Sequence, residues 1–242
     1  LQAWIPFYKM TLDEENKPSS KYYSFKRNKI NSLKVAPDLF LRADYIDTIR
    51  NIIKESDLLK TKYKYSDLSY LIIQEYIEDY YNKNLDEIID ELMFKKLGIN
   101  LTYNPFFKNS TYNVAPTEID EYFRYKEING YVHDMAAAMF GGISSHAGLF
   151  GNAINVAKVM QMYLQDGNYA NQQILKSKTI NLFNNCYYCD EDNRRGVGFD
   201  KPQLEVEGPT CGCVSMNSFG HSGWTGTFAW ADPDLDLSLI HI

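Results

Sequence analysis

The stretch Gly220-His221-Ser222-Gly223-Trp224 holds a serine in nearly the G-x-S-x-G pattern that presents a nucleophilic serine on a strand-to-helix turn. Trp224 stands where the last glycine should be, and the residues that follow read as a strand rather than a helix. The pattern also needs an aspartate and a histidine further on, for which little chain remains. We therefore reject Ser222 as a nucleophile of this type.

Three other residues could do chemistry as metal ligands, namely His133, Asp134 and His146. No H-E-x-x-H or comparable spacing links them. His133-Asp134 is better interpreted as the cap of a helix that begins "MAAAM", and His146 as a buried hydrogen-bonding residue in a glycine-rich turn. The sequence thus predicts no metal site at these three residues and no cofactor.

The four cysteines form two close pairs, Cys186-x-x-Cys189 and Cys211-x-Cys213. Such pairs can ligate zinc, form disulfides or remain thiols. The C-x-C spacing is tighter than that of usual zinc knuckles, and disulfides would require an oxidising compartment. All three states stay open at this point.

The elements that must position these residues are mainly helical from about 40 to 185. Ser66 or Asp67 can cap the second helix, Asn84 the third and Asn152 a later one, while Gly98 and Gly167 fit helix ends. The spacing of apolar residues predicts helices over 41–60, 66–81, 85–97, 132–140 and 153–166, with another from Ser177. The predicted core faces are Leu41, Tyr45, Ile49, Ile52 and Ile53; Leu68, Leu71, Ile72, Tyr76 and Tyr80; Leu85, Ile88, Ile89, Leu92 and Met93; and Val156, Val159, Met160, Tyr163 and Leu164.

Strand patterns appear only after Arg195, in "GVGFD" and "SFGHSGWTGTFAWADP". Residues 100–130 have no stable period and predict a long irregular connection. The chain opens on "LQAWIPFY" and stops within the alternating pattern "DLSLIHI", so we expect a fragment of a longer domain. Leu237 to Ile242 also match a translated transposon end, and they receive little weight as native sequence.

Composition excludes some partners. The net charge of -6 and the lack of a basic run argue against nucleic acid. No apolar run approaches the roughly 20 residues of a membrane helix, and the chain shows no signal peptide. A chain of 242 residues can bury a sizeable core as one or two domains.

Three stretches occur in order, "YKYSDLSYLI", "HDMAAAMFGGISSHAGLFGNA" and "FGHSGWTGT". Together they resemble the penicillin-recognising serine hydrolases, which include class C β-lactamases, D,D-peptidases and related esterases. The resemblance implies an α/β (α+β) fold of the β-lactamase/transpeptidase type. Residues 1–242 would be one partial domain, with a helical region over about 40–185 and central-sheet strands over about 195–242.

The resemblance implies an acyl-enzyme mechanism whose serine lies in an S-x-x-K motif. The chain contains no S-x-x-K, so the nucleophile is expected upstream and this chain alone should not acylate. Tyr65 matches the tyrosine of the family's Y-x-N motif, where it would relay a proton. Asp67 replaces the asparagine of that motif, and an ionised carboxylate would repel a carboxylate-bearing β-lactam.

The triplet His221-Ser222-Gly223 resembles the family's K/H-T/S-G strand motif. His221 would donate a hydrogen bond to Tyr65 or the substrate. Ser222 and Gly223 would line the substrate site, with the Ser222 hydroxyl on a substrate carboxylate or carbonyl. The backbone N–H of Trp224 would supply one oxyanion donor.

The run "RRGVGFDKP", with "WADPD", further resembles the β-lactamase-like domain fused to family-3 glycoside hydrolases of the N-acetylglucosaminidase type. The resemblance implies a small-molecule or cell-wall-derived substrate and a periplasmic or other extracytoplasmic location. The alternative is a non-catalytic accessory module of such a fusion protein, since aromatic residues between Tyr103 and Tyr125 could stack on sugars.

Overall fold

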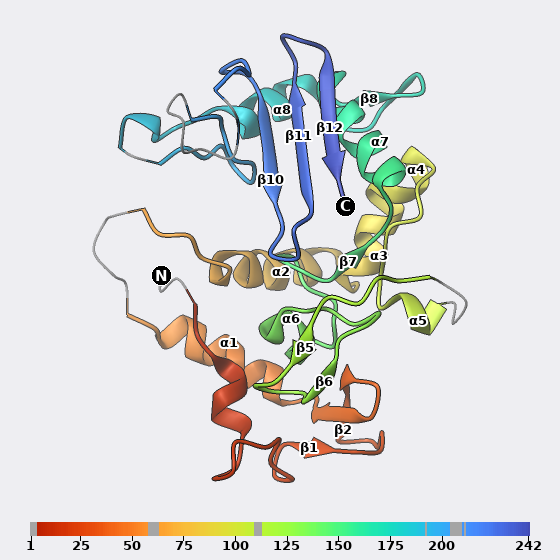
Figure 1. Ribbon diagram of the computed structural model, residues 1–242, viewed down its shortest axis with the longest axis vertical. Helices are drawn as coiled ribbons and strands as arrows, with labels where there is room; N and C mark the ends of the chain where they lie inside the picture. Colours follow the sequence, from red (N-terminus) through yellow and green to blue (C-terminus); the bar gives the residue numbers. More distant parts are fainter. Residues whose placement is uncertain (1–3, 58–62, 109–112, 192, 204–209, 211) are drawn as a thin grey trace. The chain divides into compact units, whose positions relative to one another are not determined.

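The computed structural model describes residues 4–57, 63–108, 113–191, 193–203, 210 and 212–242. The chain forms two compact units. The first comprises Leu1–Ile88 and Thr102–Phe150, and the second comprises Ile89–Leu101 and Gly151–Ile242. Figure 1 shows the elements of both units along the chain.

The first unit is built on a small antiparallel sheet with the strand order β1-β3-β2. The strands of this sheet and the helices packed near it are β1 (Tyr23–Ser24), β2 (Asn31–Ala36), β3 (Leu39–Arg42), α1 (Tyr45–Glu55), α2 (Leu68–Tyr81) and α6 (Met135–Met139). The remaining elements are η1 (Phe7–Thr11), α3 (Leu85–Ile89), β4 (Thr102–Tyr103), α5 (Pro105–Lys108), β5 (Ile119–Asp120), β6 (Lys126–Glu127) and β7 (Leu149–Phe150). The pairs β4-β7 and β5-β6 are two-stranded and antiparallel.

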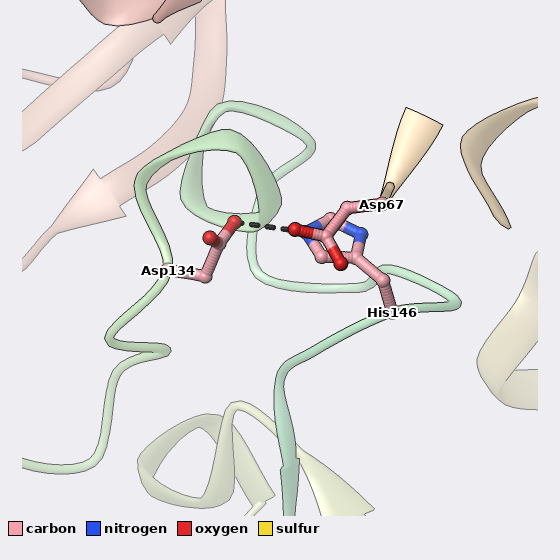
Figure 2. A group of neighbouring side chains, drawn as sticks. All are labelled: Asp67, Asp134 and His146. Carbon is pink, nitrogen blue, oxygen red and sulfur yellow. Dashed lines mark hydrogen bonds and ion pairs between the residues drawn. The ribbon is translucent and has the colours of Figure 1, made fainter. Parts of the chain in front are cut away.

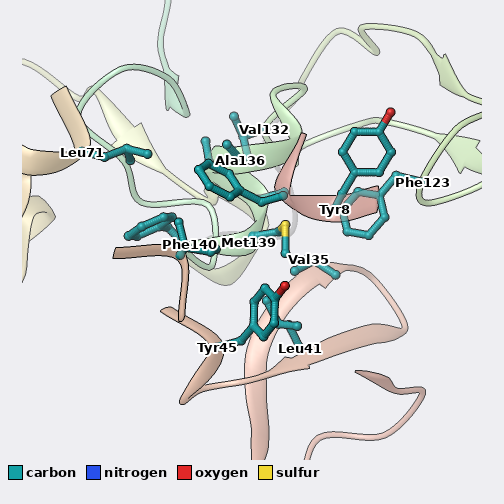
Figure 3. Close-up of a cluster of buried hydrophobic side chains, with 14 of the residues drawn as sticks. Tyr8, Val35, Leu41, Tyr45, Leu71, Phe123, Val132, Ala136, Met139 and Phe140 are labelled. Carbon is teal, nitrogen blue, oxygen red and sulfur yellow. The ribbon is translucent and has the colours of Figure 1, made fainter. Parts of the chain in front are cut away.

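The core of this unit gathers around α6, where Met139 is fully buried (Figure 3). Val35 and Leu41 from the sheet, Phe123 from the connection and Leu71 from α2 belong to the same cluster. The alanine side chains of α6 are small, so neighbouring residues can pack close to the helix backbone. The start of α6 thus lies against the core of this unit.

The second unit contains the antiparallel sheet β10-β11-β12, whose strands run side by side in Figure 1. Its elements are η2 (Asp90–Phe94), α4 (Lys95–Leu97), α7 (Ala153–Leu164), β8 (Asn168–Tyr169), β9 (Gln172–Gln173), α8 (Ser177–Asn184), η3 (Cys189–Glu191), β10 (Phe219–Ser222), β11 (Phe228–Asp232) and β12 (Leu237–His241). Met160 of α7 packs with Phe219 and Ala231 of the sheet, and Met162 packs with Phe94 and Leu97.

Several predicted helix boundaries are confirmed. Asp134 caps α6, since its carboxylate accepts from the Ala137 N–H at 2.7 Å. Asn152 caps α7 through the Asn155 N–H at 2.9 Å. Gly98 ends α4 in the left-handed region with a φ of 59°. These caps use partners three residues away or less, so the local sequence contains all the information they require.

The predicted helix over 41–60 is wrong at its start, because Leu41 lies in β3 and α1 begins at Tyr45. Leu41 is buried, as predicted, but from a strand. The sheet made by β1, β2 and β3 was not predicted. Its strands are short or irregular, and two register shifts between β2 and β3 interrupt the alternation that identifies a strand.

The predicted core faces of two helices also need correction. Ile72, Tyr76 and Tyr80 of α2 are exposed, and the buried positions are Leu68, Leu71 and the polar Gln74. Leu92 is exposed as well. The helix that was predicted over 85–97 passes through the π-helical segment η2, which changes the angular position of the residues that follow.

The C-terminal strands largely follow the prediction, since β10 and β11 fall in the predicted hairpin. The segment "GVGFD" forms only isolated bridges, from Asp200 to Arg195 and to Gly220. β12 pairs with β11 over Leu237–His241, so the residues given little weight complete the described sheet.

Candidate functional site

The segment before α2 carries two predicted site residues, Tyr65 and Asp67. Tyr65 is 50% exposed and Asp67 is half-buried. Asp67 occupies the N-cap position of α2, but its side chain makes no cap hydrogen bond. The hydroxyl of Ser66 instead accepts from the Leu68 N–H at 3.3 Å. Of the two predicted caps, Ser66 rather than Asp67 thus bonds to the start of α2.

The first turns of α2 are tied to the residues that precede His146. The Ser145 hydroxyl donates to the Tyr70 carbonyl at 2.6 Å, and the Ser145 N–H donates to Gln74 Oε1 at 3.0 Å. The Gln74 amide donates to the Ile143 carbonyl at 3.2 Å. Because Gln74 is buried, these bonds are protected from water and fix the start of α2 against this turn.

Asp134 and His146 form a close pair beside Asp67 (Figure 2). His146 Nε2 lies 2.9 Å from Asp134 Oδ1, and His146 Nδ1 lies 2.9 Å from the Ser144 hydroxyl. The predicted buried hydrogen bond of His146 is thus confirmed. Burial alone would raise the pKa of the Asp134 carboxyl, but the bonds from His146 and Ala137 hold this pKa below its ordinary value.

The same three side chains are the group in the described part of the chain that could hold a metal ion. One ligand atom from each of Asp67, Asp134 and His146 lies within 4.8 Å of the others. The sequence predicted no metal site at His133, Asp134 and His146, and His133 lies 3.2 Å from Glu118 through Nδ1 and is not in this group. Asp67 could not be found from spacing, because it comes from a segment far away in the sequence.

Asp134 follows a backbone segment that is held by a buried ion pair. Arg124 Nε lies 2.6 Å from Asp120 Oδ2, and both side chains are fully buried. The two terminal nitrogens of Arg124 donate to the carbonyls of Val132 and His133 at 2.7 and 2.6 Å. Burial raises the pKa of the Asp120 carboxyl, yet Arg124 and two backbone N–H groups bring it below its usual value.

The second set of predicted residues lies on the hairpin formed by β10 and β11. His221 pairs with Ala229 and Ser222 with Phe228, which ends β10 with an exposed Ser222. The Gly223 N–H donates to the Thr227 carbonyl at 2.7 Å and closes the turn. Trp224 follows with 86% of its surface exposed. Ser222 and Trp224 are therefore accessible on the second unit.

His221 is held by a residue that the sequence interpretation missed. Arg195 lies 3.1 Å from His221 Nε2, while His221 Nδ1 lies 2.7 Å from the Ser222 carbonyl. An arginine only donates and a carbonyl only accepts, so in these two contacts Nε2 accepts and Nδ1 donates. The donor role of His221 toward Tyr65 or the substrate stays a prediction.

Arg195 is itself fixed by Asp200. Asp200 lies 2.9 Å from Arg195 and 2.8 Å from Arg194, and its backbone pairs with Gly220 of β10. The run "RRGVGFD" contained these residues, but only their place beside β10 gives them a role. The predicted site residues thus fall into two sets, one in each unit: Tyr65 and Asp67, and His221, Ser222, Gly223 and Trp224.

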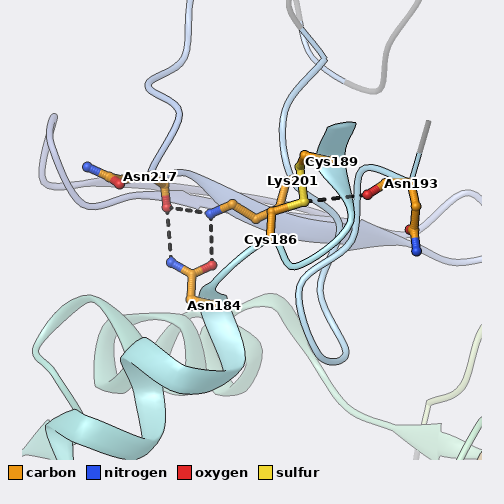
Figure 4. Close-up of a disulfide and its surroundings, with 6 residues drawn as sticks. All are labelled: Asn184, Cys186, Cys189, Asn193, Lys201 and Asn217. Carbon is orange, nitrogen blue, oxygen red and sulfur yellow. Dashed lines mark hydrogen bonds between the residues drawn. A yellow bond between two sulfur atoms is a disulfide. The ribbon is translucent and has the colours of Figure 1, made fainter. Parts of the chain in front are cut away.

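The first cysteine pair is a disulfide between Cys186 and Cys189 (Figure 4). This rules out zinc ligation and free thiols for that pair. Cys213 is also disulfide-bonded, and Cys211 lies outside the described residues. Near the bridge, the buried Lys201 ammonium donates to the side chain of Asn184 at 2.9 Å and to the Asn217 carbonyl at 3.1 Å.

A family model described as Beta-lactamase matches residues 26–241, which is most of the chain. The chain belongs to the β-lactamase family. The order of the three motif stretches therefore identified the family correctly. The narrower likeness to a domain fused to glycoside hydrolases has no counterpart in this match.

Curated relatives of this β-lactamase-family chain are about one third identical to it over the residues that match. A protein of Escherichia coli K12 described as "Putative D-alanyl-D-alanine carboxypeptidase" is 31% identical over 74% of this chain and 44% of its own length. A protein of Salmonella gallinarum with the same description is 32% identical over 85% of this chain and 51% of its own length. The chain spans about half the length of these relatives.

Solved structures agree on the fold. The octameric penicillin-binding protein homologue from Pyrococcus abyssi matches with a TM-score of 0.55 and 16% identity, over 81% of this chain and 42% of that one. A penicillin-binding protein homologue from Caulobacter crescentus matches with a TM-score of 0.51 and 17% identity, over 75% and 53% of the two chains. The mixed helix-and-strand fold predicted from the sequence is thus confirmed for a partial-size domain. Among the described residues, no helix has the length and apolar character that a membrane crossing requires.

Proposed function

We propose that this chain is part of a serine hydrolase that cleaves an amide or ester through an acyl-enzyme. The observation that carries the proposal is the match to the β-lactamase family across residues 26–241, with the tyrosine and K/H-T/S-G-like motifs in order. The description of the curated relatives favours a peptide that ends in D-alanyl-D-alanine as the first substrate to test. The nucleophilic serine would come from an S-x-x-K segment outside this chain.

The motif residues take separate roles in this proposal. Tyr65 relays the proton between the nucleophile and the leaving group. Ser222 binds the substrate carboxylate or carbonyl, and its exposed position at the end of β10 supports this role. Gly223 lines the substrate site, and the N–H of Trp224 supplies an oxyanion donor. His221 lies next to Ser222 on β10, and its Nε2 is 3.1 Å from Arg195.

The test compares this chain with a longer product of the same gene that includes the preceding coding sequence. The longer protein should be labelled by a fluorophosphonate probe and should release D-alanine from a D-alanyl-D-alanine peptide. This chain alone should do neither. Absence of an S-x-x-K serine in the longer protein, or failure of that serine to be labelled, would reject the proposal.

The role of Ser222 is tested in the same longer protein. Ser222→Ala should lower kcat/KM by about ten- to hundredfold, because this is the usual effect of losing one hydrogen bond to a charged group. Probe labelling of the nucleophile should persist, because Ser222 is not the acylated residue. The matched control is Ser177→Ala at the exposed start of α8, which should leave kcat/KM unchanged.

The alternative is a non-catalytic accessory module of a family-3 glycoside hydrolase fusion. Aromatic residues of the connection motivated it, but Tyr103 and Phe123 are buried and cannot stack on a sugar. Tyr122 remains exposed. Labelling of the longer protein would eliminate this alternative.

An extracytoplasmic location also belongs to the proposal. The Cys186–Cys189 disulfide supports it, because such bridges persist in oxidising compartments. Cell fractionation of the native host, followed by detection of the protein, tests the location. Recovery in the cytosol would contradict it.

A further inference from the structure

We propose that Asp67, Asp134 and His146 form a binding site for a divalent transition-metal ion, with zinc as the best match. Two carboxylates and one imidazole are ligands that Zn²⁺ uses commonly, and three protein ligands leave a fourth position for water. Nothing in the family motifs required this group, because its members come from three segments of the first unit (Figure 2).

The geometry is already close to that of a metal centre. Zinc lies about 2.0–2.2 Å from such ligands, so tetrahedral ligand atoms are roughly 3.4 Å apart. The three candidate atoms all lie within 4.8 Å of one another, and His146 Nε2 is 2.9 Å from Asp134 Oδ1. A small rotation of the side chains would therefore suffice to enclose an ion.

The imidazole is oriented as a metal ligand should be. The side chain of His146 is only 4% exposed, and its Nδ1 lies 2.9 Å from the hydroxyl of the buried Ser144. Ligating histidines are usually fixed in this way through their second nitrogen. Nε2 faces the carboxylates and lies 2.9 Å from Asp134 Oδ1, a distance at which the two atoms share a proton. A metal ion bound to both atoms would replace that proton.

The two carboxylates are also placed where they could bind an ion. Asp134 is fixed by the Ala137 N–H, and the preceding backbone is fixed by Arg124. Asp67 stands where the family motif has asparagine, and it makes no helix cap. A carboxylate is a stronger ligand for a hard or borderline cation than a carboxamide is, so a metal ion gives this departure a chemical reason.

Metal binding can be measured on the 242-residue chain without any substrate. The protein is treated with EDTA, its disulfides are left intact, and Zn²⁺ is titrated by calorimetry. We expect one ion per chain with a micromolar or lower Kd. Asp67→Asn and Asp134→Asn should each weaken binding at least tenfold, while the matched control Asp79→Asn on the exposed face of α2 should not change it.

The Asp134→Asn variant should still fold, because asparagine also caps helices, and circular dichroism checks this. Co²⁺ absorption then identifies the ligands, since thiolate ligands give strong charge-transfer bands that carboxylates and imidazole do not. Absence of Zn²⁺ binding, equal affinity in all variants, or thiolate bands would overturn the proposal. Because no step depends on acyl transfer, failure here is distinguishable from failure of the proposed hydrolase function.

Discussion

Asp67 and Ser222 both belong to short motifs, but the protein surrounds them differently. Asp67 lies half-buried beside a histidine and a second carboxylate, in a region where buried side chains make the supporting bonds. Ser222 stands exposed at the end of β10, where backbone pairing with β11 determines its place. The first motif depends on side-chain chemistry, and the second depends on the geometry of a hairpin.

This difference teaches where each motif is vulnerable. Removal of one partner of a buried hydrogen bond leaves the other polar group buried with no hydrogen bond, which lowers the free energy of unfolding. A hairpin tolerates most changes at its exposed side chains but not an added atom between its strands. Substitutions in the two regions should therefore differ in their cost, most of all where a buried partner is lost.

The largest effect is expected from Arg124→Ala in the first unit. It leaves the Asp120 carboxylate buried without its partner and frees the carbonyls of Val132 and His133. The free energy of unfolding should fall by about 3–5 kcal/mol in a urea titration. The control Lys126→Ala removes a solvent-accessible partner of Asp38 and should cost at most about 1 kcal/mol. Equal losses in the two variants would contradict a side-chain basis for this region.

Gly220→Ala should be the most damaging small change in the hairpin. A Cβ at this position would lie 2.3 Å from the Ala229 carbonyl oxygen, which belongs to the paired strand and cannot move away freely. We expect a loss of about 3 kcal/mol in the free energy of unfolding. Gly226→Ala is the comparison, because a Cβ at this position would have no atom within 4 Å. Its only unfavourable feature is the backbone φ of 83°, which a residue with a side chain rarely adopts. It should cost about 1 kcal/mol, and a reversed order would reject the steric explanation.

Lys201 should make the stability of the second unit depend on pH. Burial lowers the pKa of its ammonium to about 8, although Asp232 and Asp234 act in the opposite direction. The unfolded chain, with a pKa near 10.5, therefore binds more protons between these values, so stability should rise from pH 8 to pH 10. We expect a gain of roughly 2 kcal/mol in urea titrations, which Lys201→Met should abolish. A falling stability over this range in the natural chain would contradict the assignment.

The smallest effect is expected from Trp224→Ala. Because this side chain is almost wholly exposed, the free energy of unfolding should change by no more than about 0.5 kcal/mol. Trp230→Ala is the matched comparison on β11, where the buried ring should cost about 3–5 kcal/mol. A large loss at Trp224 would mean that the tryptophan supports the hairpin rather than facing a substrate.

Local patterns in the sequence predicted what depends on near neighbours. The caps at Asp134 and Asn152 and the helix end at Gly98 were found because their partners lie within one turn. The hairpin around Ser222 was found for the same reason, since strands joined by a short turn pair with each other. The motif order identified the family, and with it the fold.

The sequence could not predict associations between distant segments. The buried Gln74 of α2 was not among the predicted core positions, and its partners are Ile143 and Ser145 in another part of the chain. Asp67 meets His146 for the same reason. Arg195 and His221 are brought together only by the pairing of Asp200 with β10. Each of these contacts is a product of tertiary packing, which residue spacing does not encode.

The π-helical segment Asp90–Phe94 changes the direction in which the side chains after it point. Each residue of an α-helix rotates the chain by about 100° around the helix axis. A π-helical turn holds more residues, so each of them rotates the chain less and every later side chain points in a different direction. Leu85 and Ile88 before the segment and Phe94 and Leu97 at and after it are all buried. The π-helical turn thus sets the direction in which Phe94 and Leu97 enter the core that they share with Met162.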